Sequence, residues 1–146
     1  MKDRIKALAE LLKAQKGLYG SLAEKAGTLI EGINAGVPMD DLLRIMDERE
    51  AIMTRLNSGY SKIEETVSKP GNETLSKRPE VVALKAELDA LITKVMGTDE
   101  IAARLLKDVF LETQNGLTAI STGHKTVSTY VKQGKSAYAK YFDRKF

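Results

Sequence analysis

The sequence lacks several of the residue types on which common functional sites depend. Among its 146 residues there is no cysteine, no tryptophan and a single histidine, His124. Without cysteine, disulfides and thiolate metal sites are excluded. A diiron site in a helical bundle needs Glu-x-x-His pairs, whereas the residue three positions before His124 is Ser121. We therefore interpret His124 as a residue of a helix–helix seam and predict no metal site.

Long apolar runs and catalytic constellations are also missing. No run of about 18 apolar residues occurs, so no integral membrane segment is predicted. The start of the chain, Met1-Lys2-Asp3-Arg4, is unlike a secretory signal, and we expect a cytoplasmic location. Gly134-Lys135-Ser136 has the ending of a phosphate-binding loop, but Thr129 stands where that motif requires its first glycine. Since no Ser/His/Asp arrangement is present either, we predict a non-enzyme without a cofactor.

Proline is scarce, and its three positions divide the chain into helical patterns. Gly36, two residues before Pro38, is expected to end the first helix at its C′ position. A loop is expected over residues 68–79, which contain Pro70 and Pro79. The predicted helices lie near residues 3–35, 39–67 and 80–116.

Two features of the connections bear on the arrangement of these helices. The first connection is so short that the first two helices must be antiparallel neighbours. The third pattern is interrupted at Met96-Gly97-Thr98, where we predict a kink, with Thr98 as the N-cap if the helix restarts.

Apolar residues in the first two segments recur as expected for helices that pack in a bundle. The first segment keeps the 3-4 spacing of a coiled-coil seam over about four heptads, with Gln15 as its one polar member. Its seam comprises Ile5, Leu8, Leu12, Gln15, Tyr19, Leu22, Ala26, Leu29 and Ile33. Arg49 interrupts the apolar stripe of the second segment. The predicted fold class is all-α: an elongated antiparallel helical bundle or coiled coil of three long helices, with a mobile or extended C-terminal segment.

Aromatic side chains are few and unevenly placed. The chain has five tyrosines and three phenylalanines, and five of these eight residues follow position 129. The stretch from Leu117 to Phe146 also carries six Lys or Arg against one Asp. Exposed aromatic surface on a soluble protein usually marks a contact site. We predict a helical body over residues 1–116 and an amphipathic, basic and aromatic partner-binding segment over 117–146, which orders on binding. Its predicted partner-binding residues are Leu117, Ile120, Val127, Tyr130, Val131, Tyr138, Tyr141 and Phe142.

Two charged regions, the basic C-terminal segment and an acidic stretch of the second helix, are also compatible with other kinds of partner. Cations with interleaved aromatic rings also suit single-stranded nucleic acid or an anionic membrane surface. In this chain the cations are spread over roughly 20 residues and the body is not basic, so we favour a protein partner and predict no nucleic acid. The acidic residues between Asp40 and Glu50 fit a helix N-terminus and a solvated face; a docking patch for a basic partner is the alternative.

Two segments resemble one known family. Residues 42–56, Leu-Leu-Arg-Ile-Met-Asp-Glu-Arg-Glu-Ala-Ile-Met-Thr-Arg-Leu, are similar to the second helix of the FlgN family of flagellar type III export chaperones, where leucines surround a Glu-Arg-Glu-type centre. The ending Tyr138-Ala139-Lys140-Tyr141-Phe142-Asp143-Arg144-Lys145 resembles the family's aromatic pair followed by Asp and a basic or small residue. Helix lengths and order agree over essentially the whole chain. The final Phe146 departs from the Gly-containing terminus common in that family.

The resemblance implies a cytoplasmic chaperone for hook-associated proteins, the subunits of the hook-filament junction. Such a chaperone binds its clients largely through its C-terminal helical region and delivers them to the export machinery. A FliT-like chaperone for another flagellar client shares much of the second-helix pattern. A structural coiled-coil homodimer or adaptor protein, held together by its C-terminal segment, is the alternative from a different class.

Overall fold

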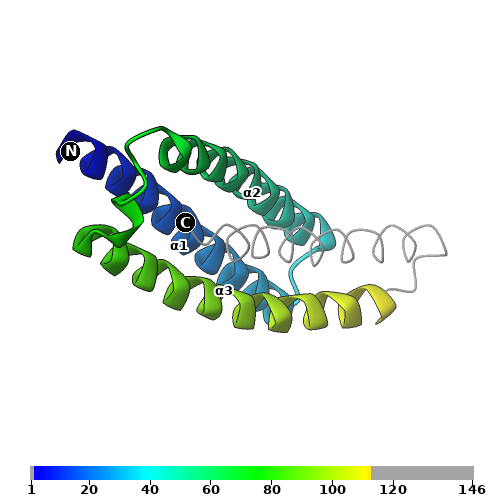
Figure 1. The fold of residues 1–146 in the computed structure, drawn as a ribbon. Coiled ribbons are helices and arrows are strands. Elements are labelled where there is room, and N and C mark those ends of the chain that lie inside the picture. The colour runs from blue at the N-terminus through cyan, green and yellow to red at the C-terminus, as the bar shows by residue number, and fades with distance from the viewer. Residues whose placement is uncertain (1, 113–146) are drawn as a thin grey trace.

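The computed structural model of the chain describes residues 2–112, which form three long helices and one short 3-10 turn (Figure 1). In chain order the elements are α1 (Lys2–Ala35), α2 (Met39–Ser68), η1 (Leu75–Lys77) and α3 (Pro79–Glu112). No strand occurs in this range, and the predicted all-α class is confirmed. The predicted helix boundaries agree within one residue, except that the expected end of the third helix at 116 lies outside the described residues.

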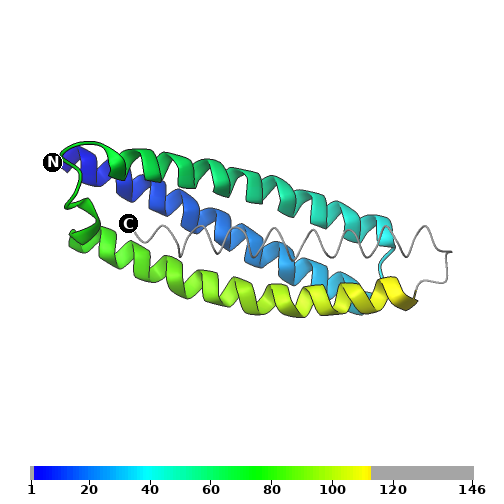
Figure 2. The ribbon, with the colours of Figure 1, turned by 45° about the vertical axis from the view of Figure 1, so that its right-hand side comes forward.

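The first helix is the structural centre of the body. α1 packs against both α2 and α3, and its contact with α3 is the more extensive. Figures 1 and 2 show α1 and α3 running in the same direction, with α2 antiparallel to both. None of the helices within residues 2–112 has both the length and the apolar character that a membrane span requires.

Sharp helix ends produce the antiparallel α1–α2 hairpin. Gly36 has a φ of 71°, and its N–H donates to the Ile33 carbonyl at 3.1 Å. The Val37 N–H donates to the Gly32 carbonyl at 3.1 Å. These two bonds form a Schellman motif, in which a left-handed glycine stops the helix. The predicted C′ position of Gly36 is therefore confirmed.

The core follows the 3-4 spacing read in the sequence. The buried residues of α1 are Leu8, Leu12, Gln15, Tyr19, Leu22, Ala26 and Leu29. Those of α2 are Leu42, Met46, Arg49, Met53, Leu56, Tyr60 and Ile63. In α3 the buried positions are Val81, Leu88, Ile92, Val95, Asp99, Ala102, Leu106 and Phe110. Each helix thus buries a single seam of the coiled-coil type, and each seam has a polar member.

The third helix is uninterrupted at the position where a kink was predicted, and the prediction that Thr98 caps a restarted helix is wrong. α3 is one helix from Pro79 to Glu112, and the Thr98 hydroxyl donates to the Lys94 carbonyl at 3.0 Å instead of capping a new helix. The seam keeps its spacing from Val95 to Asp99 on either side of Gly97. Packing of that seam outweighs the weak helix propensity of one exposed glycine, which is about 1 kcal/mol.

The predicted loop between α2 and α3 is confirmed, but it contains an anchor that we did not predict. Leu75 lies in η1 and is fully buried in the core cluster that also contains Leu8 and Val81. The Asn72 side-chain amide donates to the Thr66 carbonyl at 2.6 Å, and its oxygen accepts from Arg4 Nη1 at 3.2 Å. These contacts attach the connector to both α1 and α2.

Candidate functional site

The predicted partner-binding residues lie outside the part of the chain that the structure describes. They are Leu117, Ile120, Val127, Tyr130, Val131, Tyr138, Tyr141 and Phe142. The same holds for His124 and for residues 134–136. Within residues 2–112 three kinds of feature could support binding or chemistry. They are a buried polar layer, an acidic face on α2 and two grooves at the amino-terminal end of α1.

Arg49 is the centre of the buried polar layer. Its Nη2 donates to Asp99 Oδ2 at 2.8 Å, and its Nη1 donates to the Leu22 carbonyl at 3.0 Å. The two side chains are only 4% and 10% exposed. One side chain of α2 is therefore bonded to both α1 and α3. The residue that interrupts the apolar stripe in the sequence joins all three helices in the structure.

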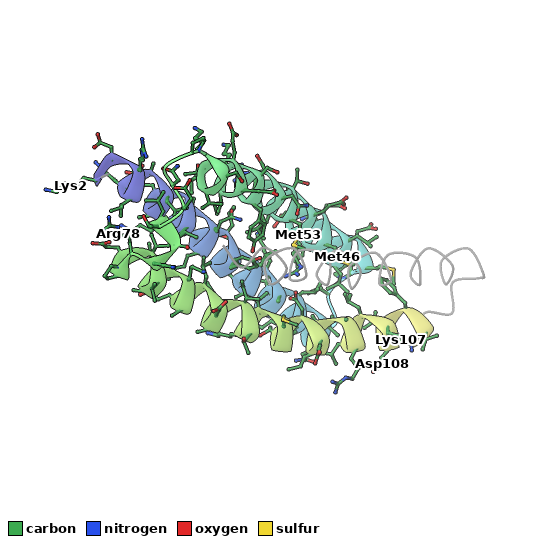
Figure 3. The ribbon with its side chains drawn as sticks, in the orientation of Figure 1. Lys2, Met46, Met53, Arg78, Lys107 and Asp108 are labelled. Atoms are coloured by element: carbon green, nitrogen blue, oxygen red, sulfur yellow. The ribbon has the colours of Figure 1, made fainter. Side chains whose placement is uncertain are left out.

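This ion pair separates two apolar clusters along the bundle. In α2, Arg49 stands between Met46 of one cluster and Met53 of the other. In α3, Asp99 stands between Val95 and Ala102 in the same way. Figure 3 shows Met46 and Met53 on the side of α2 that faces the bundle interior. A buried guanidinium and carboxylate that satisfy each other are suited to fixing helix register.

Two further polar contacts join α1 to α2. The Gln15 side-chain amide donates to the Leu56 carbonyl at 3.0 Å, and a Cβ added at Gly59 would overlap the same amide. The hydroxyls of Tyr19 and Tyr60 are hydrogen-bonded to each other. Burial raises the pKa of Tyr19 to about 12, against the smaller lowering effect of the Tyr60 hydroxyl. At neutral pH this tyrosine is therefore an uncharged hydrogen-bonding group of the core.

The acidic residues at the start of α2 divide between ion pairs and solvent. Glu48 is bonded to Lys25 of α1, and this hydrogen bond raises the pKa of Lys25. Asp41 lies 3.4 Å from Arg44 on the same helix. Asp40, Asp47 and Glu50 are exposed. The region matches the solvated face predicted from the sequence. Within residues 2–112 no group of three or more Asp, Glu or His side chains is placed to hold a metal ion.

The larger described groove lies between the first halves of α1 and α3, and we call it the α1–α3 groove. Its volume is about 460 Å³, and its lining includes Lys2, which projects from one end of the bundle (Figure 3). The residues that line it are Lys2, Ile5, Lys6, Ala9, Lys13, Glu80 and Leu84. Sequence reasoning missed this groove. Its signal was the recurrence of lysine at positions 2, 6 and 13, which lie on one face of a helix.

A smaller groove of about 330 Å³ lies on the other side of α1, against the α2–α3 connector. Arg4 lines it and is held there by hydrogen bonds to the Gly71 carbonyl at 3.3 Å and to Asn72 at 3.2 Å. Backbone amides, its own first and then that of Gly71, lower the pKa of the neighbouring Glu73 carboxyl. Arg4 and Asn72 are thus bonded to other groups of the protein, whereas the three lysines of the α1–α3 groove are exposed.

Comparisons of the chain with protein-family models, with curated proteins and with solved structures each found no match.

Proposed function

We propose that the protein is a helical chaperone of the flagellar export type, which holds a hook-associated client protein before its secretion. The body of residues 2–112 serves as a scaffold in this proposal, and the segment 117–146 binds the client. The family resemblance of residues 42–56 and 138–145 supplies the flagellar assignment.

One observation carries the proposal: the aromatic residues divide sharply between the body and the segment that follows it. Within residues 2–112 the aromatic side chains are Tyr19, Tyr60 and Phe110, and none is more than 3% exposed. The remaining five aromatic residues all follow position 129. The body thus uses its aromatic rings in the core, as an ordinary bundle does. The five later aromatic rings are additional to those that fill the core of the body, which supports a role for them in contacts with another chain.

The chemistry of the segment favours an amphipathic helical client. Leu117, Ile120 and Val127 recur at helical spacing and would supply apolar anchors, as in helix-in-groove or coiled-coil pairing. Lys132, Lys135 and Lys140 would steer a client that carries acidic residues. Tyr138, Tyr141 and Phe142 are of the residue types that dominate binding energy at protein interfaces or add large apolar contact area.

Calorimetric titration with a purified hook-filament junction subunit tests the proposal. The full chain is compared with a chain ending at Gln114 and with a Tyr138→Ser/Tyr141→Ser/Phe142→Ser variant. Loss of three interface aromatics is expected to weaken binding about tenfold or more, and truncation is expected to abolish it. The control is Val82→Ser/Ile101→Ser, which removes apolar side chains that are 50% and 48% exposed on the body. Unchanged affinity after truncation would move the client site to the body.

Sedimentation across a dilution series separates the proposal from the structural homodimer. A permanent dimer stays dimeric when dilute, and its C-terminal amides are protected from hydrogen exchange without any client. A chaperone is expected to gain that protection only when client is added. Affinity that collapses with added salt would instead indicate anionic lipid or nucleic acid.

A further inference from the structure

We infer that the α1–α3 groove is a docking site for a short amphipathic helix with acidic flanks, contributed by a protein partner distinct from the client. The inference goes beyond the proposed function, because the groove belongs to the body and the client segment does not.

The floor of the groove is apolar and fixed in place. Ile5 and Leu84 are half-buried and pack against the main apolar cluster of the core, and Ala9 lies one helical turn after Ile5. Because their inner sides are held by the core, their outer sides present a preformed apolar strip. A partner that covers this strip does not need to rearrange the bundle, which keeps the cost of association low.

The rim of the groove is basic. Lys2, Lys6 and Lys13 are exposed, and none takes part in an ion pair within residues 2–112. A single carboxylate, that of Glu80, stands among the lining residues opposite these three ammonium groups. One turn further along, Lys16 differs from these three lysines because it pairs with Glu87 at 2.9 Å. The three free lysines therefore provide charge complementarity for an acidic partner.

Length and chemistry together favour a helix as the occupant. From Lys2 to Lys13 the groove extends about 17 Å, which is three turns of helix. A helix with apolar residues at i, i+4 and i+7 would cover the strip, while acidic residues beside them would meet the lysines. A phosphate backbone would leave the apolar floor without a partner and would be repelled by Glu80. Lysine stems also cover apolar surface, so these side chains contribute to both parts of the contact.

The test uses the full chain and a fluorescein-labelled, helix-stapled peptide of about 14 residues, roughly four turns. The peptide carries Leu at i, i+4 and i+7, Glu on both flanks, and Ala or Gln elsewhere. Fluorescence anisotropy measures its affinity for the unaltered chain and for Lys6→Glu/Lys13→Glu. The matched control is Lys94→Glu/Lys107→Glu, which makes the same change of charge at exposed positions of α3 outside the groove. Thermal unfolding by circular dichroism verifies that each variant is folded.

We expect Lys6→Glu/Lys13→Glu to bind the peptide about tenfold more weakly and the control to change by less than about twofold. A peptide with Lys in place of Glu is expected to regain affinity for the Lys6→Glu/Lys13→Glu variant. In NMR spectra the peptide is expected to shift the amide signals of Ala9 and Leu84. The client-segment variant Tyr138→Ser/Tyr141→Ser/Phe142→Ser is expected to bind the peptide normally, which separates this site from the client site.

Three results would overturn the inference. Equal weakening by the groove variant and its control would show that only overall charge matters. Equal binding of a peptide with Ser in place of Leu would show a site for any polyanion. Absence of binding, or shifts confined to residues away from the groove, would show that the groove does not accept an acidic helix.

Discussion

At the scale of single residues, the interior of the bundle depends on a few polar side chains whose partners are far away in sequence. Gln15, Tyr19 and Arg49 occupy seam positions where apolar residues are the rule. Each makes a hydrogen bond to another helix. Buried polar groups that are fully satisfied specify one arrangement of a core, because any other arrangement leaves them without partners.

Gly59 and Gly17 are predicted to respond in opposite ways to alanine. Gly59→Ala places a methyl group against the buried Gln15 amide and is expected to destabilise the protein by about 1 to 3 kcal/mol. Gly17 is exposed within α1 and has no other atom within 4 Å of the new methyl position. Gly17→Ala is expected to stabilise by about 0.5 to 1 kcal/mol. Urea unfolding measures both; a stable Gly59→Ala variant would contradict the tight contact with Gln15.

Tyr19 is predicted to make stability depend on alkaline pH. Because its pKa rises from 10.0 to about 12 on folding, its contribution is fully present below pH 10 and is lost as the pH rises through 12. The loss approaches about 2 to 3 kcal/mol at the upper end. Urea unfolding of the protein and of Tyr19→Phe from pH 9 to about 12 isolates this residue. The advantage of the native protein over the variant should shrink with rising pH; a constant difference would show that Tyr19 ionises normally.

The positions of these residues were predictable, but their partners were not. The 3-4 spacing placed Gln15 and Tyr19 in the α1 seam, and both are buried. Nothing near Gln15 in the sequence indicates the Leu56 carbonyl or the gap left by Gly59. Such pairs arise only when two helices are aligned, because the alignment decides which side chain meets which backbone group.

At the scale of elements, the third helix shows how packing overrides a local signal. Gly97 and Thr98 are weak helix formers, and the sequence pattern around them predicted a kink, with Thr98 as the N-cap of a helix that restarts. The seam residues Val95, Asp99 and Ala102 keep their spacing across this point. A helix that buries its seam on both sides of one exposed glycine is continuous, since a break would remove several core contacts.

Gly97→Ala is therefore predicted to stabilise the protein. Gly97 is exposed, and no atom lies within 4 Å of the position of an added methyl group. The expected gain is about 0.5 to 1 kcal/mol in urea unfolding. Gly97→Pro is expected to destabilise by about 3 kcal/mol or more, because proline removes a hydrogen bond from the middle of the helix. A neutral or harmful Gly97→Ala would indicate that the helix does bend there.

At the scale of the whole molecule, the Arg49–Asp99 pair is the contact that unites the three helices. Arg49 stands in the apolar stripe that the sequence predicts for the second helix, whereas the burial of Asp99 in the seam of α3 emerges only in the structure. The pairing itself joins residues 50 apart, and no pattern within one helix reveals it. The predicted client residues from Leu117 to Phe142 fall outside residues 2–112, so their roles stay predictions.

Removal of one charge from this pair is predicted to be worse than removal of both. Arg49→Met leaves the Asp99 carboxylate buried without its guanidinium and is expected to cost about 3 to 5 kcal/mol. Arg49→Met/Asp99→Leu is expected to recover most of that loss, since apolar side chains of similar size then fill the site. Urea unfolding of both single variants and the double variant forms a double-mutant cycle. Additive losses would show that the two charges do not interact.

The central place of α1 affects how the chain is made. α1 is synthesised before α2 and α3, yet its most extensive contact is with α3, and the Lys16–Glu87 pair joins residues 71 positions apart. At translation rates of about 5 to 20 residues per second, Glu87 is added roughly 4 to 14 seconds after Lys16. During that interval the α1–α2 hairpin covers part of the α1 seam. The part of the α1 seam that packs against α3 stays exposed to neighbouring chains on the same messenger RNA. We therefore expect the nascent protein to be most prone to aggregation before its third helix leaves the ribosome.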